Sequence, residues 1–171
     1  MVSDRDREKY ERAFDTFDSD RDGRITWSDV QVLIDRFEGG PGIQSFYQMY
    51  WQELVGLSGG DEDGLWRDAF IEAQSQLEFS PSQEDTIQSA ADSIFQSIAN
   101  DGGDEIAKDE FVNLLRRVWG TDDLHAADAF RQLGPDRDGR VSRQEFVQAA
   151  QKHFFTTHHN VGVSAAFFSE L

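Results

Sequence analysis

The feature that most constrains the fold is an acidic stretch of twelve residues, 18–29, that opens with carboxylates at alternate positions. These are Asp18, Asp20 and Asp22, and Gly23 follows them directly. Apolar residues at helical spacing lie on both sides, in segments 10–17 and 30–37. The sequence therefore predicts a helix, a sharp acidic turn at Gly23 and a second helix.

The same frame recurs three more times without gaps. In residues 18–29 an aromatic residue, Phe14, stands four positions before the first residue, and the eighth residue is the aliphatic Ile25. Sliding this frame along the chain finds equivalent loops at 58–69, 99–110 and 134–145. The eighth residues of those loops are Leu65, Ile106 and Val141. This repetition predicts four helix–loop–helix units.

Helical periodicity extends over almost the whole chain, and no segment shows convincing strand alternation. We therefore expect an all-α fold of about eight helices. Segments 39–42 and 77–82 predict joints between units. Because helix–loop–helix units pair through their loops, we expect an N-terminal pair in residues 1–79 and a C-terminal pair with a tail in residues 80–171.

The first loop carries a set of oxygen ligands suited to calcium. Calcium takes six to eight oxygens, which a twelve-residue loop supplies from positions 1, 3, 5, 7, 9 and 12, with glycine at position 6. The matching residues are Asp18, Asp20, Asp22, Arg24 (through its carbonyl), Thr26 and Asp29. The plainer alternative is an acidic turn before a helix that Thr26 and Asp29 cap. Aspartate at position 12 is one methylene shorter than the usual glutamate, so the loop also suits magnesium.

The fourth loop, 134–145, keeps most of this pattern. Its candidate ligands are Asp136, Asp138, Arg140 (through its carbonyl), Ser142 and Glu145. Gly134 leaves position 1 without a carboxylate, and a water molecule would have to replace it. The alternative is a structural turn held by Gly139, with Ser142 and Glu145 as a capping box.

The two middle loops depart further from the pattern. In loop 99–110 the remaining carboxylate ligands are Asp101 and Glu110, and Asp104 stands where glycine is wanted. Metal binding there stays open. Loop 58–69 lacks the final carboxylate, so we expect a solvated acidic turn.

The charge and composition of the chain limit the classes of partner that it can bind. The chain has 33 acidic and 16 basic residues, and its net charge of -17 repels phosphate backbones and anionic lipids, so we expect no nucleic acid partner. The longest apolar stretch, 161–168, is far shorter than the roughly 20 residues of a membrane span. The first residues lack the pattern of a secretory signal. We therefore expect a cytoplasmic monomer without membrane insertion.

The loops 18–29 and 134–145, together with the four repeats, resemble the EF-hand superfamily. Within it, the degenerate second loop, the long aromatic helix over 43–54 and the 154–157 tail are similar to sarcoplasmic calcium-binding proteins and calerythrin-like bacterial proteins. This resemblance implies two EF-hand pairs packed into one compact globule.

Three functions follow from this resemblance. We expect a non-enzymatic calcium, or calcium/magnesium, buffer or signal modulator whose protein target is unknown. A calcium sensor that opens a groove is an alternative, but sensors favour methionine, and this chain has only Met1 and Met49. A luciferin-binding or photoprotein-like ligand carrier is another, because such relatives line a cavity with histidine, tryptophan and tyrosine. His153 lies on an apolar helix face, where a lone histidine is more often a hydrogen-bonded core residue. The sequence shows no set of acid–base or nucleophilic residues typical of an active site, so we do not expect an enzyme.

Overall fold

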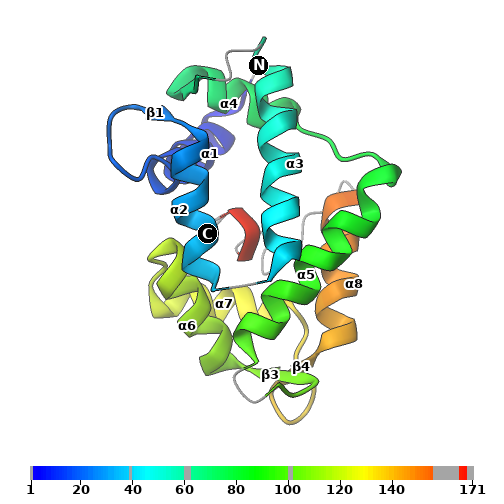
Figure 1. The fold of residues 1–171 in the computed structure, drawn as a ribbon. Helices are drawn as coiled ribbons and strands as arrows, with labels where there is room; N and C mark the ends of the chain where they lie inside the picture. The colour runs from blue at the N-terminus through cyan, green and yellow to red at the C-terminus, as the bar shows by residue number, and fades with distance from the viewer. Residues whose placement is uncertain (1, 39, 60–62, 100–101, 156–165, 169–171) are drawn as a thin grey trace.

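Helices make up most of the molecule, as the sequence predicts (Figure 1). The structure is a computed structural model and describes residues 2–38, 40–59, 63–99, 102–155 and 166–168. In these ranges the α-helices are α1 (Asp4–Phe17), α2 (Trp27–Phe37), α3 (Pro41–Leu57), α4 (Arg67–Gln76), α5 (Glu84–Ile98), α6 (Lys108–Trp119), α7 (Asp123–Gln132) and α8 (Arg143–Phe155). A 3-10 turn, η1 (Pro81–Gln83), precedes α5.

Four short strands join the loops in pairs. β1 (Arg24–Ile25) lies antiparallel to β2 (Leu65–Trp66), and β3 (Glu105–Ala107) lies antiparallel to β4 (Arg140–Ser142). Ile25 pairs with Leu65, and Ile106 pairs with Val141. These are the eighth residues of the four loops, so the predicted repeat frame is confirmed.

Local signals account for several helix ends. The side chain of Ser3 caps α1 by accepting a hydrogen bond from the Asp6 amide, and Asp122 does the same for α7 through His125. Before α5, the Ser80 amide donates to Gln83 Oε1 at 2.6 Å, as part of a capping box. Glycine at position 120, with φ +65°, ends α6.

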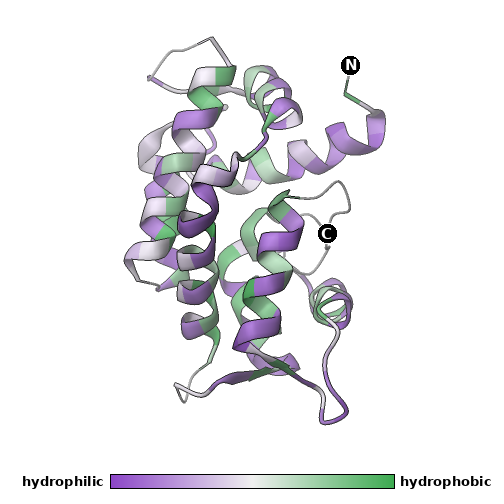
Figure 2. Ribbon diagram, turned by 90° about the vertical axis from the view of Figure 1, so that its right-hand side faces the viewer, coloured by the Kyte–Doolittle hydropathy of each residue, from purple (hydrophilic) through white to green (hydrophobic). Residues whose placement is uncertain are grey.

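The core runs through both halves of the chain, and α3 lies at its centre (Figure 1). Phe46, Tyr47 and Tyr50 on α3 are almost completely buried. The apolar faces of the helices turn inwards and their hydrophilic faces turn outwards (Figure 2). Helices α3 and α5 pack tightly at Gly42, where an added Cβ would lie 2.4 Å from the Ser89 carbonyl oxygen.

Two arginines fasten the end of α2 to the end of α6. Arg117 donates from Nε to the Arg36 carbonyl at 3.0 Å and from Nη2 to the Phe37 carbonyl at 3.2 Å. In return, Arg36 Nη1 donates to the Val118 carbonyl at 3.3 Å. These bonds satisfy carbonyl groups that a helix end leaves unpaired. They connect the helix that follows loop 18–29 with the helix that follows loop 99–110.

Segment 166–168 lies inside the molecule, between α2 and α3 in the view of Figure 1. Its residues Ala166, Phe167 and Phe168 are all buried. From sequence, this part of the chain was only a short apolar stretch. Of the predicted 154–157 tail, Phe154 and Phe155 belong to α8, and residues 156 and 157 lie outside the described ranges. No helix in the described ranges is both long and apolar enough to cross a membrane.

Candidate metal centre

Three carboxylates of the first loop converge on one point. Asp18, Asp20 and Asp22 each offer an oxygen, and these oxygens all lie within 4.8 Å of one another. Asp18, at the end of α1, is only 5% exposed, whereas Asp20 and Asp22 face solvent. No other group of three or more potential metal-ligating side chains of this kind occurs in the part of the chain that the structure describes.

Backbone hydrogen bonds hold the turn that brings these carboxylates together. Asp18 Oδ1 accepts from the Asp22 amide at 3.1 Å, and its Oδ2 accepts from the Gly23 amide at 3.0 Å. Asp22 Oδ1 accepts from the Arg24 amide at 2.8 Å. Gly23 has φ +86°, a conformation that side chains disfavour, so glycine is needed at position 6.

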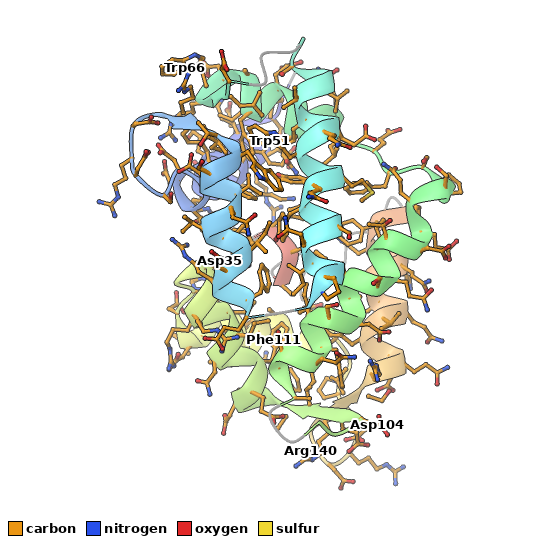
Figure 3. The ribbon with its side chains drawn as sticks, viewed as in Figure 1. Asp35, Trp51, Trp66, Asp104, Phe111 and Arg140 are labelled. Atoms are coloured by element: carbon orange, nitrogen blue, oxygen red, sulfur yellow. The ribbon has the colours of Figure 1, made fainter. Side chains whose placement is uncertain are left out.

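No basic side chain in the described ranges forms an ion pair with Asp18, Asp20 or Asp22. The Arg24 guanidinium instead lies 5.9 Å from the ring centroid of Trp66, an exposed residue beside β1 (Figure 3). Three carboxylates this close repel one another unless a cation or protons neutralise them. Hard oxygen donors of this kind are the ligands that calcium and magnesium prefer, so the residues fit such an ion.

Asp29 belongs to the loop but not to this group of converging carboxylates, and both of its oxygens accept hydrogen bonds. Oδ1 accepts from the amide and hydroxyl of Ser19, at 3.2 and 2.6 Å. Oδ2 accepts from the amide and hydroxyl of Thr26, at 2.8 and 2.7 Å. Burial raises the pKa of Asp29, but the bonds from Ser19 and Thr26 outweigh it, and the pKa is lowered overall. Asp29 therefore caps α2 here and would have to exchange some of these bonds to bind metal.

Loop 134–145 has the hydrogen bonds of a structural turn. Asp136 Oδ1 accepts from the amides of Asp138 and Arg140, at 2.9 and 3.0 Å. Ser142 and Glu145 form the capping box that the alternative interpretation expects, because Glu145 Oε2 accepts from the Ser142 amide and Ser142 Oγ accepts from the Glu145 amide. The carboxylates of this loop do not converge as those of the first loop do.

Gly134 explains part of this difference. Its φ is +74°, whereas Asp18, at the same position of the first loop, has φ -68°. The backbone at Gly134 is therefore in the left-handed region, which glycine adopts more readily than residues that carry a side chain. Sequence comparison of the two loops showed the missing carboxylate but not the different backbone.

The third loop repeats the contact between positions 9 and 12, since the Ala107 amide donates to Glu110 Oε2 at 2.7 Å. A hollow of about 360 Å³ beside it is lined by Asp104, Glu110 and Arg140, and Asp104 and Arg140 lie together at one end of the molecule (Figure 3). Asp101 of this loop lies outside the described residues, as do Asp61 and Glu62 of the second loop.

Comparison with known proteins agrees with this geometry. A family model described as EF hand matches residues 11–34, which include the first loop. No curated protein sequence matches the chain.

Solved structures resemble the whole chain. Okadaic acid binding protein 2.1 has a TM-score of 0.63 at 17% identity, over 97% of this chain and 96% of its own. For n-aequorin the TM-score is 0.62 at 15% identity, over 98% of this chain and 93% of its own. The sarcoplasmic calcium-binding protein from amphioxus has 0.61 at 13% identity, over 98% of each chain. At these identities the likeness shows the fold alone.

Residues 11–34 thus match the EF-hand family, and the fold of the whole chain is similar to that of a sarcoplasmic calcium-binding protein. The expected resemblance to sarcoplasmic calcium-binding proteins is confirmed for the fold, and n-aequorin is about as similar in structure.

Proposed function

We propose that the protein binds calcium reversibly through loop 18–29 and acts as a non-enzymatic calcium, or calcium/magnesium, buffer or signal modulator. The observation that carries the proposal is the convergence of Asp18, Asp20 and Asp22 within 4.8 Å, with no basic partner in the described ranges. The Arg24 carbonyl, Thr26 and Asp29 stand at the remaining ligand positions. A bound ion would neutralise the clustered charge and stabilise the loop between α1 and α2.

Loop 134–145 is a second and weaker candidate for the same ion. Asp136, Asp138, the Arg140 carbonyl, Ser142 and Glu145 would supply its ligands. Gly134 supplies no carboxylate at position 1, and the carboxylates of this loop do not converge as those of the first loop do. We therefore propose that the first loop fills before the fourth.

Calorimetric titration of metal-free protein with calcium, with and without millimolar magnesium, tests the proposal. Asp20→Asn should weaken the tightest site by about tenfold or more, because a charged ligand is lost where three charges attract the ion. The matched control is Asp35→Asn on the exposed side of α2, which makes the same charge change outside the loop (Figure 3). Equal affinities for the two variants, or no heat of binding in wild type, would refute the first loop as the site.

The aromatic core supports a buffer more than a sensor. Sensor proteins expose adaptable grooves rich in methionine. Here Met49 is only partly buried against a core of phenylalanine and tyrosine rings, and the largest of these side chains are already enclosed. A cytoplasmic monomer without a nucleic acid partner remains our proposal for the cellular setting.

A ligand carrier is the second candidate, favoured by a cleft of about 820 Å³ beside α8. Its lining includes Tyr10, Phe79, His153, Phe154 and Phe168, and this volume lies in the range of small-molecule sites. The structural likeness to okadaic acid binding protein 2.1 supports asking whether this chain binds an apolar compound. Quenching of tryptophan fluorescence by okadaic acid would test the carrier role. Saturable binding that Phe154→Ala abolishes would support it.

A further inference from the structure

Buried contacts hold segment 166–168 in the interior. Tyr47 Oη donates to the Phe167 carbonyl at 2.6 Å, and Trp119 Nε1 donates to the Ala166 carbonyl at 3.2 Å. The Phe168 ring packs on Tyr50, with centroids 5.1 Å apart. The residues that hold the segment come from α3 and α6, which belong to different halves of the chain.

Each of these three aromatic residues also contacts Phe17, the last residue of α1. The Phe17 ring centroid lies 6.3 Å from that of Tyr47, 5.8 Å from that of Tyr50 and 5.8 Å from that of Trp119. Asp18, the first candidate ligand, follows Phe17 directly. We call Phe17, Tyr47, Tyr50 and Trp119 the aromatic bridge, because they connect the metal loop with segment 166–168.

We propose that segment 166–168 is a docked element whose attachment is coupled through the aromatic bridge to the ion in loop 18–29. This inference rests on the proposed function of that loop. An ion held by Asp18 fixes the end of α1, and with it the position of the Phe17 ring. Close-packed aromatic rings transmit such a constraint, because they have few alternative arrangements. Ion binding therefore strengthens docking of the segment.

The coupling must act equally in the other direction. If the ion stabilises docking, then docking raises the affinity of the loop for the ion by the same factor. Weakening the docking bonds at a distance from the loop should therefore weaken ion binding, even though no ligand is changed. If the segment only filled space in the core, weakening its docking bonds would leave the ion affinity of the loop unchanged.

Two tyrosines one helical turn apart offer a matched pair of variants. Tyr47→Phe removes the hydroxyl that donates to Phe167 and keeps the ring beside Phe17. Tyr50→Phe removes a hydroxyl that donates to Gln74 Oε1 and likewise keeps its ring beside Phe17. Trp119→Phe is a second test variant, because it removes the donor to Ala166 while retaining an aromatic ring.

The experiment combines calcium calorimetry with hydrogen exchange of the peptide that contains residues 166–168. In wild type, calcium should slow amide exchange in this peptide. A net hydrogen bond changes an equilibrium constant by about two- to tenfold, so Tyr47→Phe should weaken the tightest calcium site by about threefold. Tyr50→Phe should remain within about twofold of wild type on the same reasoning.

The outcomes separate this inference from the proposed function. If wild type binds no calcium at the first loop, the proposed function fails and the coupling fails with it. If calcium binds but neither slows exchange in the peptide nor distinguishes the tyrosine variants, the coupling is overturned and the calcium site stands. Equal weakening by Tyr47→Phe and Tyr50→Phe would also overturn it, because the effect would then belong to the core in general.

Discussion

Asp29 shows how one side chain meets two requirements of a loop. As position 12 it is a candidate metal ligand, and as the residue bonded to Thr26 it caps α2. The sequence predicted both roles as alternatives, because the two patterns share the same residues. The structure adds the hydrogen bonds that Ser19 donates to Asp29. The sequence did not indicate them, because Ser19 stands at a loop position that supplies no metal ligand.

Lengthening this side chain should change ion selectivity. Asp29→Glu adds one methylene and allows two oxygens to reach an ion, which suits calcium, with ligands at about 2.3–2.6 Å, better than octahedral magnesium at about 2.0–2.1 Å. We expect calcium affinity to rise and magnesium affinity to stay equal or fall. Competition between the two ions measures this, with Asp35→Glu as the control. A preference that stays flat would show that Asp29 already coordinates fully.

The lowered pKa of Asp29 predicts a particular loss of stability in acid. Because its folded-state pKa lies below the unfolded value of about 3.9, the carboxylate stabilises the fold above that pH, and this contribution disappears as pH falls through the folded-state pKa. Urea unfolding in the presence of a chelator, from pH 6 to pH 2, should show a stability gap between wild type and Asp29→Asn that narrows below about pH 4. A gap of constant size would contradict this assignment.

Two substitutions at Gly134 separate the effect of backbone strain on stability from the effect of an added carboxylate on calcium affinity. Both Gly134→Asp and Gly134→Ala should destabilise the metal-free protein by about 1–2 kcal/mol, because φ is +74° at this position. Only the aspartate variant places a carboxylate beside Asp136 and Asp138, so only it should tighten calcium binding at the fourth loop. If calorimetry finds the two variants alike, loop 134–145 is a structural turn.

At the scale of elements, the periodic features were predictable. The eighth residue of each loop is aliphatic because it is buried in a two-stranded pairing, so an aliphatic residue recurs at this position in every repeat. The crossing of α3 and α5 has no comparable sequence signal. Gly42 looked like part of a helix-breaking joint at 39–42, yet it lies within α3 and permits close packing on Ser89.

This crossing predicts opposite effects for two glycines of the same helix. Gly42→Ala should destabilise the protein by about 1–3 kcal/mol, because its Cβ would lie 2.4 Å from a backbone oxygen. Gly56→Ala should stabilise it by a few tenths to about 1 kcal/mol, since nothing lies within 4 Å and alanine favours helix. Thermal or chemical denaturation measures both changes in stability. If Gly42→Ala left the stability unchanged, α3 and α5 would be able to move apart at little cost.

At the scale of the whole molecule, the position of segment 166–168 could not be predicted. Its two phenylalanines follow one another, so they carry no helical or strand periodicity, and the atoms that bind Tyr47 and Trp119 are backbone carbonyls, which every residue possesses. Sequence patterns identify which side chains are apolar. They do not identify which distant helices receive them.

A filled interior predicts little new apolar surface upon calcium binding. Rings from all parts of the core are already packed together, including those of segment 166–168. A hydrophobic dye such as ANS should therefore gain little fluorescence when calcium is added to folded protein, whereas acid-expanded protein should serve as the positive control. A strong calcium-dependent increase would favour the sensor interpretation over the buffer.

The reciprocal arginine bonds between α2 and α6 have a consequence for cooperativity. Because Arg36 and Arg117 each bind the other helix at its last carbonyl groups, neither helix can change its exit angle without breaking bonds that the partner helix also needs. An ion that bound the first loop and shifted α2 would therefore also act on α6, which lies in the other half of the chain. In such an arrangement, one occupied loop would be enough for both halves of the molecule to respond together, even where the other loops lack ligands.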